Sequence, residues 1–260
     1  MSHQAMPPRP PKTPTFDESQ LRRFLSFVMD PAAGSIELRV FHSTFDNSGF
    51  VTGAQQYSKT LAGWYDDINH LVVDCKRLQG VSGYITVNPV NHALLGRSYN
   101  RLAKAKHTTS DADITKIRWA YIDLDPRRPA DISSTDEELS LAVERREDIL
   151  AAQPAIRRSA IWGKSGNGAW ILVRLPDLPN DTAGREKVAK MIDLMAAIYS
   201  DEFVEVDVKT KNPGRVMCTP GLMKCKGSNI PGRPWRMATI DGCGDESMQV
   251  GKAGVDELAA

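Results

Sequence analysis

The sequence contains few of the features that define disulfide-rich, zinc-binding or membrane proteins. Its 260 residues include only four cysteines, with no Cys-x-x-Cys pair among them, so neither a zinc ribbon nor a disulfide framework is expected. No apolar run is long enough to cross a membrane, and no signal peptide opens the chain. We therefore expect reduced thiols, a cytoplasmic location and no membrane partner.

Two further signatures are missing. The chain has no His-x-His metal pair, which argues against a rolling-circle nickase. Gly163-Lys164-Ser165 looks like the end of a Walker A loop, but Arg158 stands where that motif requires glycine, and a strand-like run follows where it requires a helix. The sequence therefore lacks a helicase motor, and we expect any helicase to be a separate protein or a domain outside this chain.

Acidic residues are absent from one long segment, although the whole chain is almost neutral. The formal net charge is +1, so no overall field attracts nucleic acid. Residues 209–236 contain no Asp or Glu, and their basic residues are Lys209, Lys211, Arg215, Lys224, Lys226, Arg233 and Arg236. This composition suits a polyanionic ligand, and a solvated loop is the alternative.

What the sequence does contain is an apolar run that ends in two carboxylates, Trp119-Ala120-Tyr121-Ile122-Asp123-Leu124-Asp125-Pro126. Strand side chains alternate between faces, so Asp123 and Asp125 would share one face. Two carboxylates repel each other unless a cation lies between them, and hard cations such as Mg²⁺ and Mn²⁺ prefer carboxylate oxygens. The pattern predicts a metal site, and a strand end with two solvated aspartates is the alternative.

A third carboxylate is predicted on a second strand. In Val204-Glu205-Val206-Asp207-Val208-Lys209 the valines alternate with charged residues. Asp207, together with Asp123 and Asp125, would form a site for two divalent cations about 3.5–4 Å apart. An ordinary amphipathic strand has the same pattern and remains the alternative.

The first part of the chain, residues 16–115, predicts a mixed α/β subdomain. Residues 1–15 are proline-rich and predict a disordered tail. Asp17 can cap a helix that follows it. The other expected elements are strands over 35–41 and 83–88 and one or two helices over about 54–79.

The second part, residues 116–240, predicts a ferredoxin-like (RRM-like) subdomain. Its expected strands cover 118–124, 158–163, 169–175 and 203–208, and its expected helices cover 135–151 and 183–199. The order is β-α-β-β-α-β. The predicted fold class is thus α+β, with this subdomain packed against the N-terminal one, and residues 241–260 are expected to form a tail or linker.

This topology predicts where the site lies. In a ferredoxin-like sheet the first strand lies between the third and the fourth, so Asp123 and Asp125 would lie beside Asp207 and beside the turn Ser165-Gly166-Asn167-Gly168. Backbone N–H groups in such a turn, with the serine hydroxyl, can cradle phosphate, and a plain hairpin turn is compatible with the same residues.

Taken together, these features resemble the archaeo-eukaryotic primase superfamily, and more narrowly the primase-polymerase domains of plasmid, phage and mobile-element replication proteins. The matching motifs are Tyr121-Ile122-Asp123-Leu124-Asp125, Ser165-Gly166-Asn167-Gly168-Ala169-Trp170, Val206-Asp207 and Arg215…Pro220-Gly221…Lys226. Two earlier stretches, 84–91 and 108–113, are also similar to this group, although a strand end and a polar loop would explain them equally well. The resemblance covers about residues 36–240.

The resemblance implies a DNA primase-polymerase, an enzyme that makes primers on a single-stranded DNA template from nucleoside triphosphates and extends them in phage or mobile-element replication. It implies that Asp123, Asp125 and Asp207 are catalytic and bind two Mg²⁺ or Mn²⁺ ions. The residues expected to bind the nucleotide are Lys164, Ser165, Gly166, Asn167, Gly168, Trp170, Arg215 and Lys226, and those expected to bind nucleic acid are Lys209, Lys211, Lys224, Arg233 and Arg236.

One position departs from the family pattern. The family usually has a histidine at the end of the second motif, where this chain has Trp170. Tryptophan has one N–H donor and no titratable group, so it cannot replace a phosphate-binding imidazole, although it could stack on a base or sugar. Two other functions stay open: a non-catalytic module that binds single-stranded nucleic acid, and a metal-dependent nuclease that uses the same carboxylates.

Overall fold

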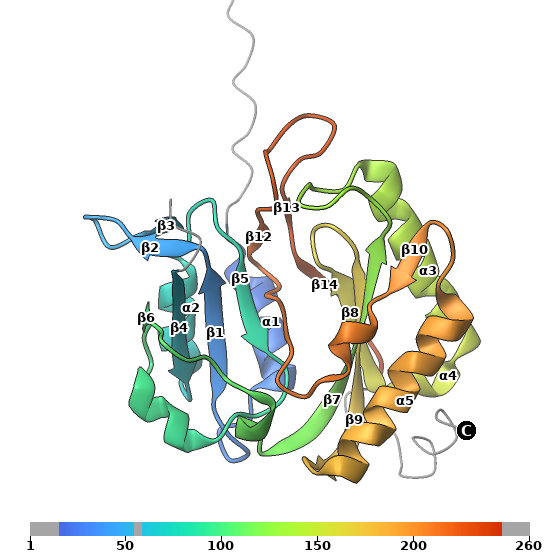
Figure 1. The fold of residues 1–260 in the computed structure, drawn as a ribbon, viewed down its shortest axis with the longest axis horizontal. Coiled ribbons are helices and arrows are strands. Elements are labelled where there is room, and N and C mark those ends of the chain that lie inside the picture. Colours follow the sequence, from blue (N-terminus) through green and yellow to red (C-terminus); the bar gives the residue numbers. More distant parts are fainter. Residues whose placement is uncertain (1–15, 55–58, 246–260) are drawn as a thin grey trace, which may run out of the picture.

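The computed structural model describes residues 16–54 and 59–245. These residues form two five-stranded antiparallel sheets that lie side by side, each with helices against one face (Figure 1). The strand order is β11-β5-β1-β4-β6 in the first sheet and β10-β7-β9-β8-β14 in the second. The predicted α+β class is therefore confirmed.

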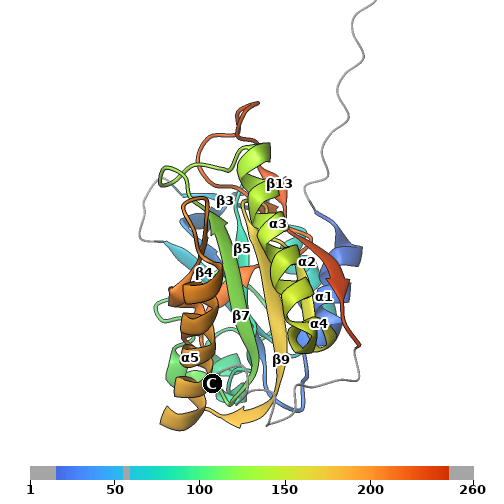
Figure 2. The same cartoon turned by 90° about the vertical axis from the view of Figure 1, so that its right-hand side faces the viewer.

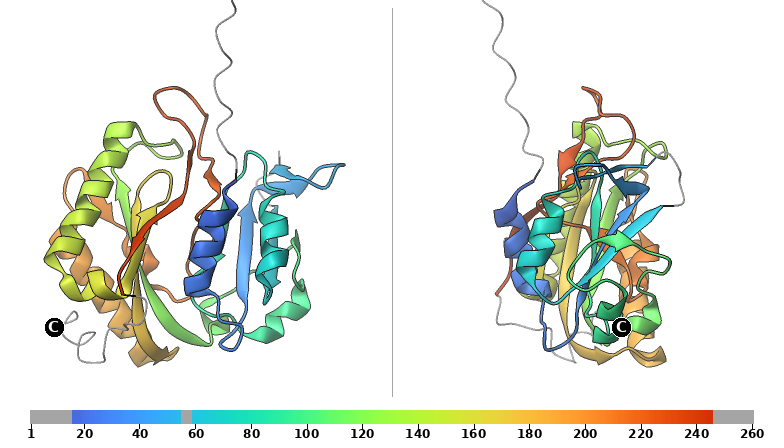
Figure 3. Two further views of the ribbon diagram at one scale, coloured as in Figure 1. Left: turned by 180° about the vertical axis from the view of Figure 1, so that it is seen from behind. Right: turned by 90° about the vertical axis from the view of Figure 1, so that its left-hand side faces the viewer.

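The first sheet is formed mainly by the N-terminal half of the chain. Its elements are α1 (Glu18–Val28), β1 (Ile36–Phe41), β4 (Thr60–Tyr65), α2 (Ile68–Cys75), β5 (Gly83–Thr86) and β6 (Ala103–Lys104), with a small hairpin of β2 (Ser43–Phe45) and β3 (Val51–Gly53) and the 3₁₀ turns η1 (His92–Arg97) and η2 (Asp111–Asp113). Helices α1 and α2 cover one face of this sheet, as the view from behind shows (Figure 3). The Asp17 side chain caps α1 by accepting from two backbone N–H groups, as predicted.

The second sheet is built around two long strands, β7 (Lys116–Pro126) and β9 (Ala169–Pro179). Its other strands are β8 (Ala160–Lys164), β10 (Val204–Val206) and β14 (Thr239–Cys243), and its outer face is covered by α3 (Asp136–Ala152), α4 (Pro154–Ser159) and α5 (Thr182–Tyr199) (Figure 2). β7 pairs with β10 on one side and with β9 on the other. The first strand of this part thus lies between the fourth and the third, as predicted.

The chain after β10 links the two sheets. The turn η3 (Val208–Lys211) is followed by β11 (Val216–Cys218), which pairs with β5 in the first sheet. β12 (Met223–Lys224) and β13 (Arg236–Met237) then pair with each other, and we call residues 223–237 the basic flap. The flap rises between the two sheets in Figure 1, before β14 returns to the second sheet beside β8.

The two faces of β7 pack into different cores, and this decides where its carboxylates lie. Ala120, Ile122 and Leu124 pack in one cluster with buried residues of α3 and α5. Tyr121 belongs to another cluster, which contains residues of α1, α2 and both sheets. Because strand side chains alternate, Asp123 lies on the same face as Tyr121, the face that is turned toward the first sheet.

Several predictions are wrong in detail. Residues 60–65 form a strand rather than a helix; β4 is buried on both faces, so its sequence shows no period of two. The strand predicted over 158–163 begins at Ala160, because Pro154 starts the short helix α4. The strand predicted over 203–208 ends at Val206, because Asp207 caps η3. Part of the predicted tail, residues 241–243, completes β14.

Two other expectations concern the chain as a whole. None of the four cysteines, all of which lie among the described residues, forms a disulfide bond. In the ranges 16–54 and 59–245, no helix combines the length and the apolar character that crossing a bilayer requires. The predicted tail over 1–15 and the remainder of the predicted C-terminal tail lie outside the described residues.

Candidate active site

A cavity of about 610 Å³ lies between the two sheets, and both aspartates of β7 line it. Tyr121, Asp123 and Asp125 alternate with buried apolar residues along β7, so all three point toward this cavity. The sequence alternation therefore places the two carboxylates side by side on the inner face of the second sheet.

Asp207 lies beside the β7 carboxylates, on the turn that follows β10. Its backbone N–H donates to the Asp123 carbonyl oxygen at 2.9 Å, and its carboxylate caps η3 by accepting from the Lys209 N–H at 2.9 Å. Asp207 lines a smaller cleft of about 310 Å³, which also includes Asp125 and Lys226. Asp125 and Lys226 line the larger cavity as well, so the two hollows meet at Asp125.

The pKa of Asp123 is shifted by its burial and by the charged groups around it. Burial and the neighbouring Asp125 raise the pKa of Asp123 to about 7, and Asp207 adds a smaller contribution of the same sign. The positive charge of Lys224 and a hydrogen bond from Tyr121 act in the opposite direction. The side chain is still partly exposed to the cavity, so a ligand or ion can reach it.

The carboxylate oxygens of these three aspartates are suitable ligands for a hard divalent cation. However, two of the three carboxylates already form ion pairs with arginines. Arg128 Nη1 lies 2.8 Å from Asp125 Oδ1, and Arg215 Nη2 lies 3.0 Å from Asp207 Oδ2. Throughout the described residues, no three His, Cys, Asp or Glu side chains are grouped so that they could hold a metal ion. A cation held between Asp123 and Asp125 would therefore compete with Arg128 for Asp125 Oδ1.

The glycine-rich turn is only partly in the cavity. Ser165 and Asn167 line it, and the side-chain nitrogen of Asn167 is buried without a hydrogen-bond partner. The Gly168 N–H donates to the Ser165 hydroxyl at 3.0 Å, so this N–H is not available to a phosphate. A Cβ on Gly166 would lie 2.6 Å from Lys224 Cβ. The glycine at 166 therefore allows the basic flap to pack against the turn.

Lys164 and Trp170 do not line the cavity. Trp170 is fully buried, and its ring meets Phe24 of α1 edge to face with 6.1 Å between centroids. Lys164 Nζ lies 3.9 Å from Asp241 of β14. In this arrangement Trp170 is a core residue with no access to a base or sugar, although it lies directly opposite Asp123 in the β7–β9 pair.

The basic flap contributes two lysines to the cavity, Lys224 and Lys226. Lys224 Nζ donates to the Tyr84 hydroxyl at 2.9 Å and lies 4.5 Å from the centre of the Tyr84 ring. Arg215, which follows η3, also lines the cavity. The cavity thus combines carboxylates on one strand with three cations from the segment that is free of acidic residues.

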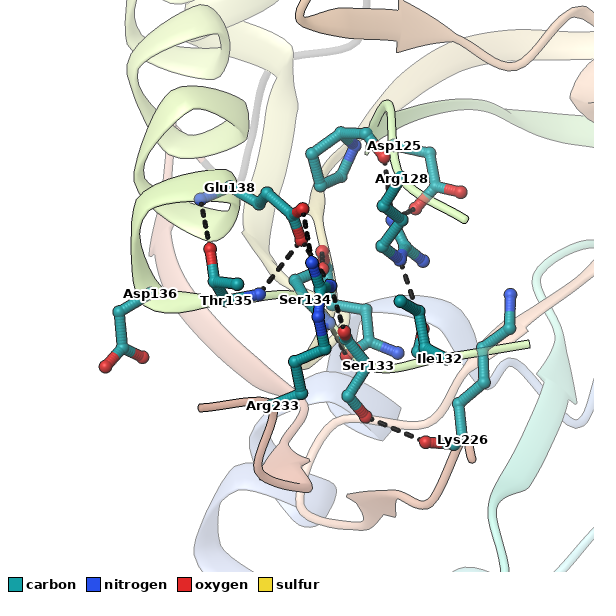
Figure 4. Close-up of polar contacts among 12 residues, drawn as sticks. Asp125, Arg128, Ile132, Ser133, Ser134, Thr135, Asp136, Glu138, Lys226 and Arg233 are labelled. Atoms are coloured by element: carbon teal, nitrogen blue, oxygen red, sulfur yellow. Dashed lines mark hydrogen bonds and ion pairs between the residues drawn. The ribbon is translucent and has the colours of Figure 1, made fainter. Parts of the chain in front are cut away.

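Two other basic residues of the flap anchor it to the N-terminus of α3. Arg233 contacts both carboxylate oxygens of Glu138, at 2.8 and 2.9 Å, and donates to the Ser133 carbonyl oxygen (Figure 4). Arg236 forms an ion pair of 2.6 Å with Asp136. These guanidinium groups hold the flap in place, so contact with nucleic acid would require them to leave their carboxylate partners.

The two remaining residues that were predicted to contact nucleic acid, Lys209 and Lys211, lie in different surroundings. Lys209 is exposed and lines the smaller cleft. Lys211 Nζ lies 2.9 Å from Asp193 of α5. Among the predicted nucleic-acid residues, Lys209 and Lys224 are therefore the two that line a hollow of the site.

Replacing Gly166 by alanine is expected to displace the basic flap. Gly166 has a φ of +93°, and the added Cβ would also lie 2.7 Å from the Arg236 carbonyl oxygen. We expect a loss of about 1–3 kcal/mol in unfolding free energy, measured by thermal unfolding. Gly232→Ala is the matched control, because a Cβ at Gly232 meets nothing within 4 Å; equal behaviour of the two variants would contradict the role of Gly166.

Sequence reasoning missed several residues that the structure brings into the site. Arg39 and Phe41 of β1 and Arg128 after β7 line the cavity but belong to no predicted motif. Tyr84 and residues 109–111 also line it, and they fall within the two early stretches that are similar to primase-polymerase domains. The only signal for Arg39 is a charged residue alternating with apolar ones along β1.

Comparisons with known proteins define the class of fold. The chain matches no protein-family model and no curated protein sequence. Its structure is similar to the AEP domain of the cyanophage S-2L primase-polymerase (PrimPol), with a TM-score of 0.53 and 16% identity over 95% of this chain and 100% of that domain. It also matches primase RepB′ with a TM-score of 0.44 and 13% identity, over 92% of this chain and 61% of that one. The first of these likenesses shows that the chain has a fold similar to that of this AEP domain.

Proposed function

We propose that this protein is a metal-dependent, template-directed nucleotidyltransferase that synthesises DNA primers and extends them. The observation that carries the proposal is the cavity itself, in which Asp123 and Asp125 face Arg215, Lys224 and Lys226. Carboxylates that attract a divalent cation and cations that attract a triphosphate are the two requirements of nucleotidyl transfer. In this view the second sheet with α3 and α5 is the ferredoxin-like catalytic subdomain, and residues 16–115 form the second subdomain.

The residues of the site take complementary roles in this proposal. Asp123, Asp125 and Asp207 would hold Mg²⁺ or Mn²⁺ ions, which in such sites activate an attacking hydroxyl and neutralise a leaving phosphate. Arg128 and Arg215 now neutralise Asp125 and Asp207. When cations take over that task, both guanidinium groups are free to contact phosphate oxygens, for which their planar donor pattern is suited.

The residues of the second motif have narrower roles than the sequence implied. Ser165 and Asn167 line the cavity in which the nucleotide would bind, but the side-chain nitrogen of Asn167 is buried and so does not face a ligand. Gly166 and Gly168 act through the backbone by allowing close packing. Lys164 and Trp170 have no part in binding in this proposal.

The alternative is a non-catalytic module that binds single-stranded nucleic acid. One observation favours it: arginines already pair with Asp125 and Asp207, so the site can be electrically balanced without metal. A pure binder would bind single-stranded DNA equally well with or without divalent cations.

Primer synthesis on single-stranded DNA is the direct test. The protein is incubated with labelled ribo- or deoxynucleotides and Mn²⁺ or Mg²⁺, and the products are resolved by size. Labelled products that need template, nucleotide and metal would establish the proposal. Binding without products would favour the non-catalytic module, and strand cleavage without nucleotides would favour a nuclease. A helicase partner remains a prediction, tested by whether products lengthen on duplex templates when a helicase is added.

The exposed Lys209 is expected to contact the DNA backbone. Each phosphate contact to single-stranded nucleic acid changes the slope of log affinity against log salt by about 0.7. Lys209→Gln should therefore reduce that slope by about 0.7, measured by fluorescence anisotropy over a salt series. Lys190→Gln on the outer helix α5 serves as the control, since Lys190 is exposed and lies outside both hollows; an equal change in both variants would contradict the assignment.

A further inference from the structure

The wall of the cavity that the first sheet supplies carries side chains that the proposed chemistry does not use. Arg39 and Phe41 of β1 and Tyr84 of β5 line the cavity from this side. Arg39 and Tyr84 are direct neighbours in the β1–β5 pair, so their side chains share one face of the sheet. Phe41 lies two residues beyond Arg39 and faces the same way.

The aromatic pair forms an exposed platform next to positive charge. The rings of Phe41 and Tyr84 lie 5.3 Å apart between centroids, at an angle of 63°. Phe41 is 38% exposed, which is unusual for a phenylalanine on a central strand. The Arg39 guanidinium lies 5.8 Å from the centre of the Phe41 ring. An accessible ring flanked by cations is a typical surface for stacking a nucleobase.

The Arg39 guanidinium is held by hydrogen bonds to its neighbours and still has N–H groups that can donate to a ligand. Its Nε and Nη2 contact the two carboxylate oxygens of Glu37 at 2.8 and 2.7 Å, and Glu37 is fully buried. Nη2 also donates to the Thr109 carbonyl oxygen. The hydrogen bonds described for Arg39 leave its Nη1 group for a ligand. A buried carboxylate is costly, and here it fixes a guanidinium at the wall of the cavity.

We propose that Arg39, Phe41 and Tyr84 form the subsite for the nucleoside part of the incoming nucleotide. The base stacks on Phe41, Tyr84 borders it, and Arg39 donates to an oxygen of the same nucleotide. This inference rests on the proposed function and names the residues that would hold the substrate's base.

Two observations favour a free nucleotide over a nucleic-acid strand as the occupant. The volume of about 610 Å³ lies within the range of about 300–1,000 Å³ that is typical of small-molecule sites. Lys224 contacts Tyr84 directly and lines the same cavity as Asp123. A nucleotide whose phosphates contact Lys224 therefore lies in the same cavity as the aromatic wall and next to it.

The test compares Phe41→Ala with Phe50→Ala. Phe50 is 37% exposed and lies outside the cavity, so it matches Phe41 in size and exposure. Each variant is titrated with a fluorescent nucleoside triphosphate and, separately, with a labelled single-stranded oligonucleotide. We expect Phe41→Ala to weaken nucleotide binding about 5- to 100-fold, with oligonucleotide affinity unchanged and Phe50→Ala behaving like the unmutated protein.

Other results would overturn the inference. Equal nucleotide affinity in Phe41→Ala and Phe50→Ala would show that the wall holds no base. Loss of oligonucleotide binding with unchanged nucleotide binding would assign the wall to a strand instead. Either outcome leaves the proposed function standing, whereas failure of the unmutated protein to bind any nucleotide would overturn both.

The role of Arg39 is tested with a double substitution, because replacing Arg39 alone would leave Glu37 buried without a counter-charge. Glu37→Gln/Arg39→Gln removes both charges together, and thermal unfolding checks that the variant is folded. We expect a loss of nucleotide affinity of about tenfold, typical for a hydrogen bond to a charged group. Unchanged nucleotide affinity in the folded double variant would exclude Arg39 from the subsite.

Discussion

Replacing Asp123 by alanine is expected to abolish primer synthesis while leaving the fold and DNA binding intact. Asp123 and Asp125 are the two carboxylates of β7 that line the cavity together with Lys224 and Lys226 of the basic flap. Cation binding at such a site supplies several kcal/mol of transition-state stabilisation, and each 1.36 kcal/mol changes the rate tenfold. We therefore expect incorporation to fall by about 10³-fold or more, measured as labelled nucleotide incorporated per unit time.

Two controls make this result interpretable. Asp148→Asn removes a carboxylate whose side chain is 71% exposed on the outer helix α3, and it should keep full activity. Circular dichroism and single-stranded DNA binding of Asp123→Ala should match those of the unmutated protein. Activity that survives in Asp123→Ala would contradict the assigned site. Activity lost in Asp148→Asn as well would point to a general effect of charge.

Replacing Asp123 by asparagine is expected to stabilise the metal-free protein at pH 8. Burial and Asp125 raise the pKa of Asp123 to about 7, whereas an unfolded aspartate titrates near 3.9. Between these pH values the folded protein holds a proton that the unfolded chain has released. The stability of the unmutated protein therefore falls as the pH rises from about 4 to about 7, and levels off above.

The size of this effect follows from the shift. Three pKa units correspond to about 4 kcal/mol, and the partial exposure of Asp123 to the cavity reduces this to about 1–2 kcal/mol. Asp123→Asn should thus unfold about 2–8 °C above the unmutated protein at pH 8 in the presence of a chelator, and the difference should vanish near pH 4. An Asp123→Asn protein that is less stable at pH 8 would contradict the described environment of this carboxylate.

Metal addition completes the experiment. A cation that binds only the folded state at 100 times its Kd raises the unfolding free energy by about 2.7 kcal/mol. Mn²⁺ or Mg²⁺ should therefore raise the melting temperature of the unmutated protein and leave that of Asp123→Asn unchanged. An equal rise in both proteins would place the cation elsewhere.

The sequence by itself determined the local elements and the faces that they present. The alternation along β7 placed Asp123 and Asp125 on one face, because strand side chains follow a period of two wherever the sheet is. The capping box of Thr135 and Glu138 predicted the start of α3, because its hydrogen bonds join residues only three positions apart. The position of β7 between β10 and β9 followed from the order of helices and strands.

Only the tertiary structure decided what covers each face. Trp170 matches the second motif by position, yet α1 buries its ring. Gly166 looked like a phosphate-binding glycine, yet the basic flap packs against it. Arg39 belongs to no motif, yet it lines the cavity from the other sheet. These outcomes depend on contacts between residues far apart in the chain, which local periodicity and motif spacing do not encode.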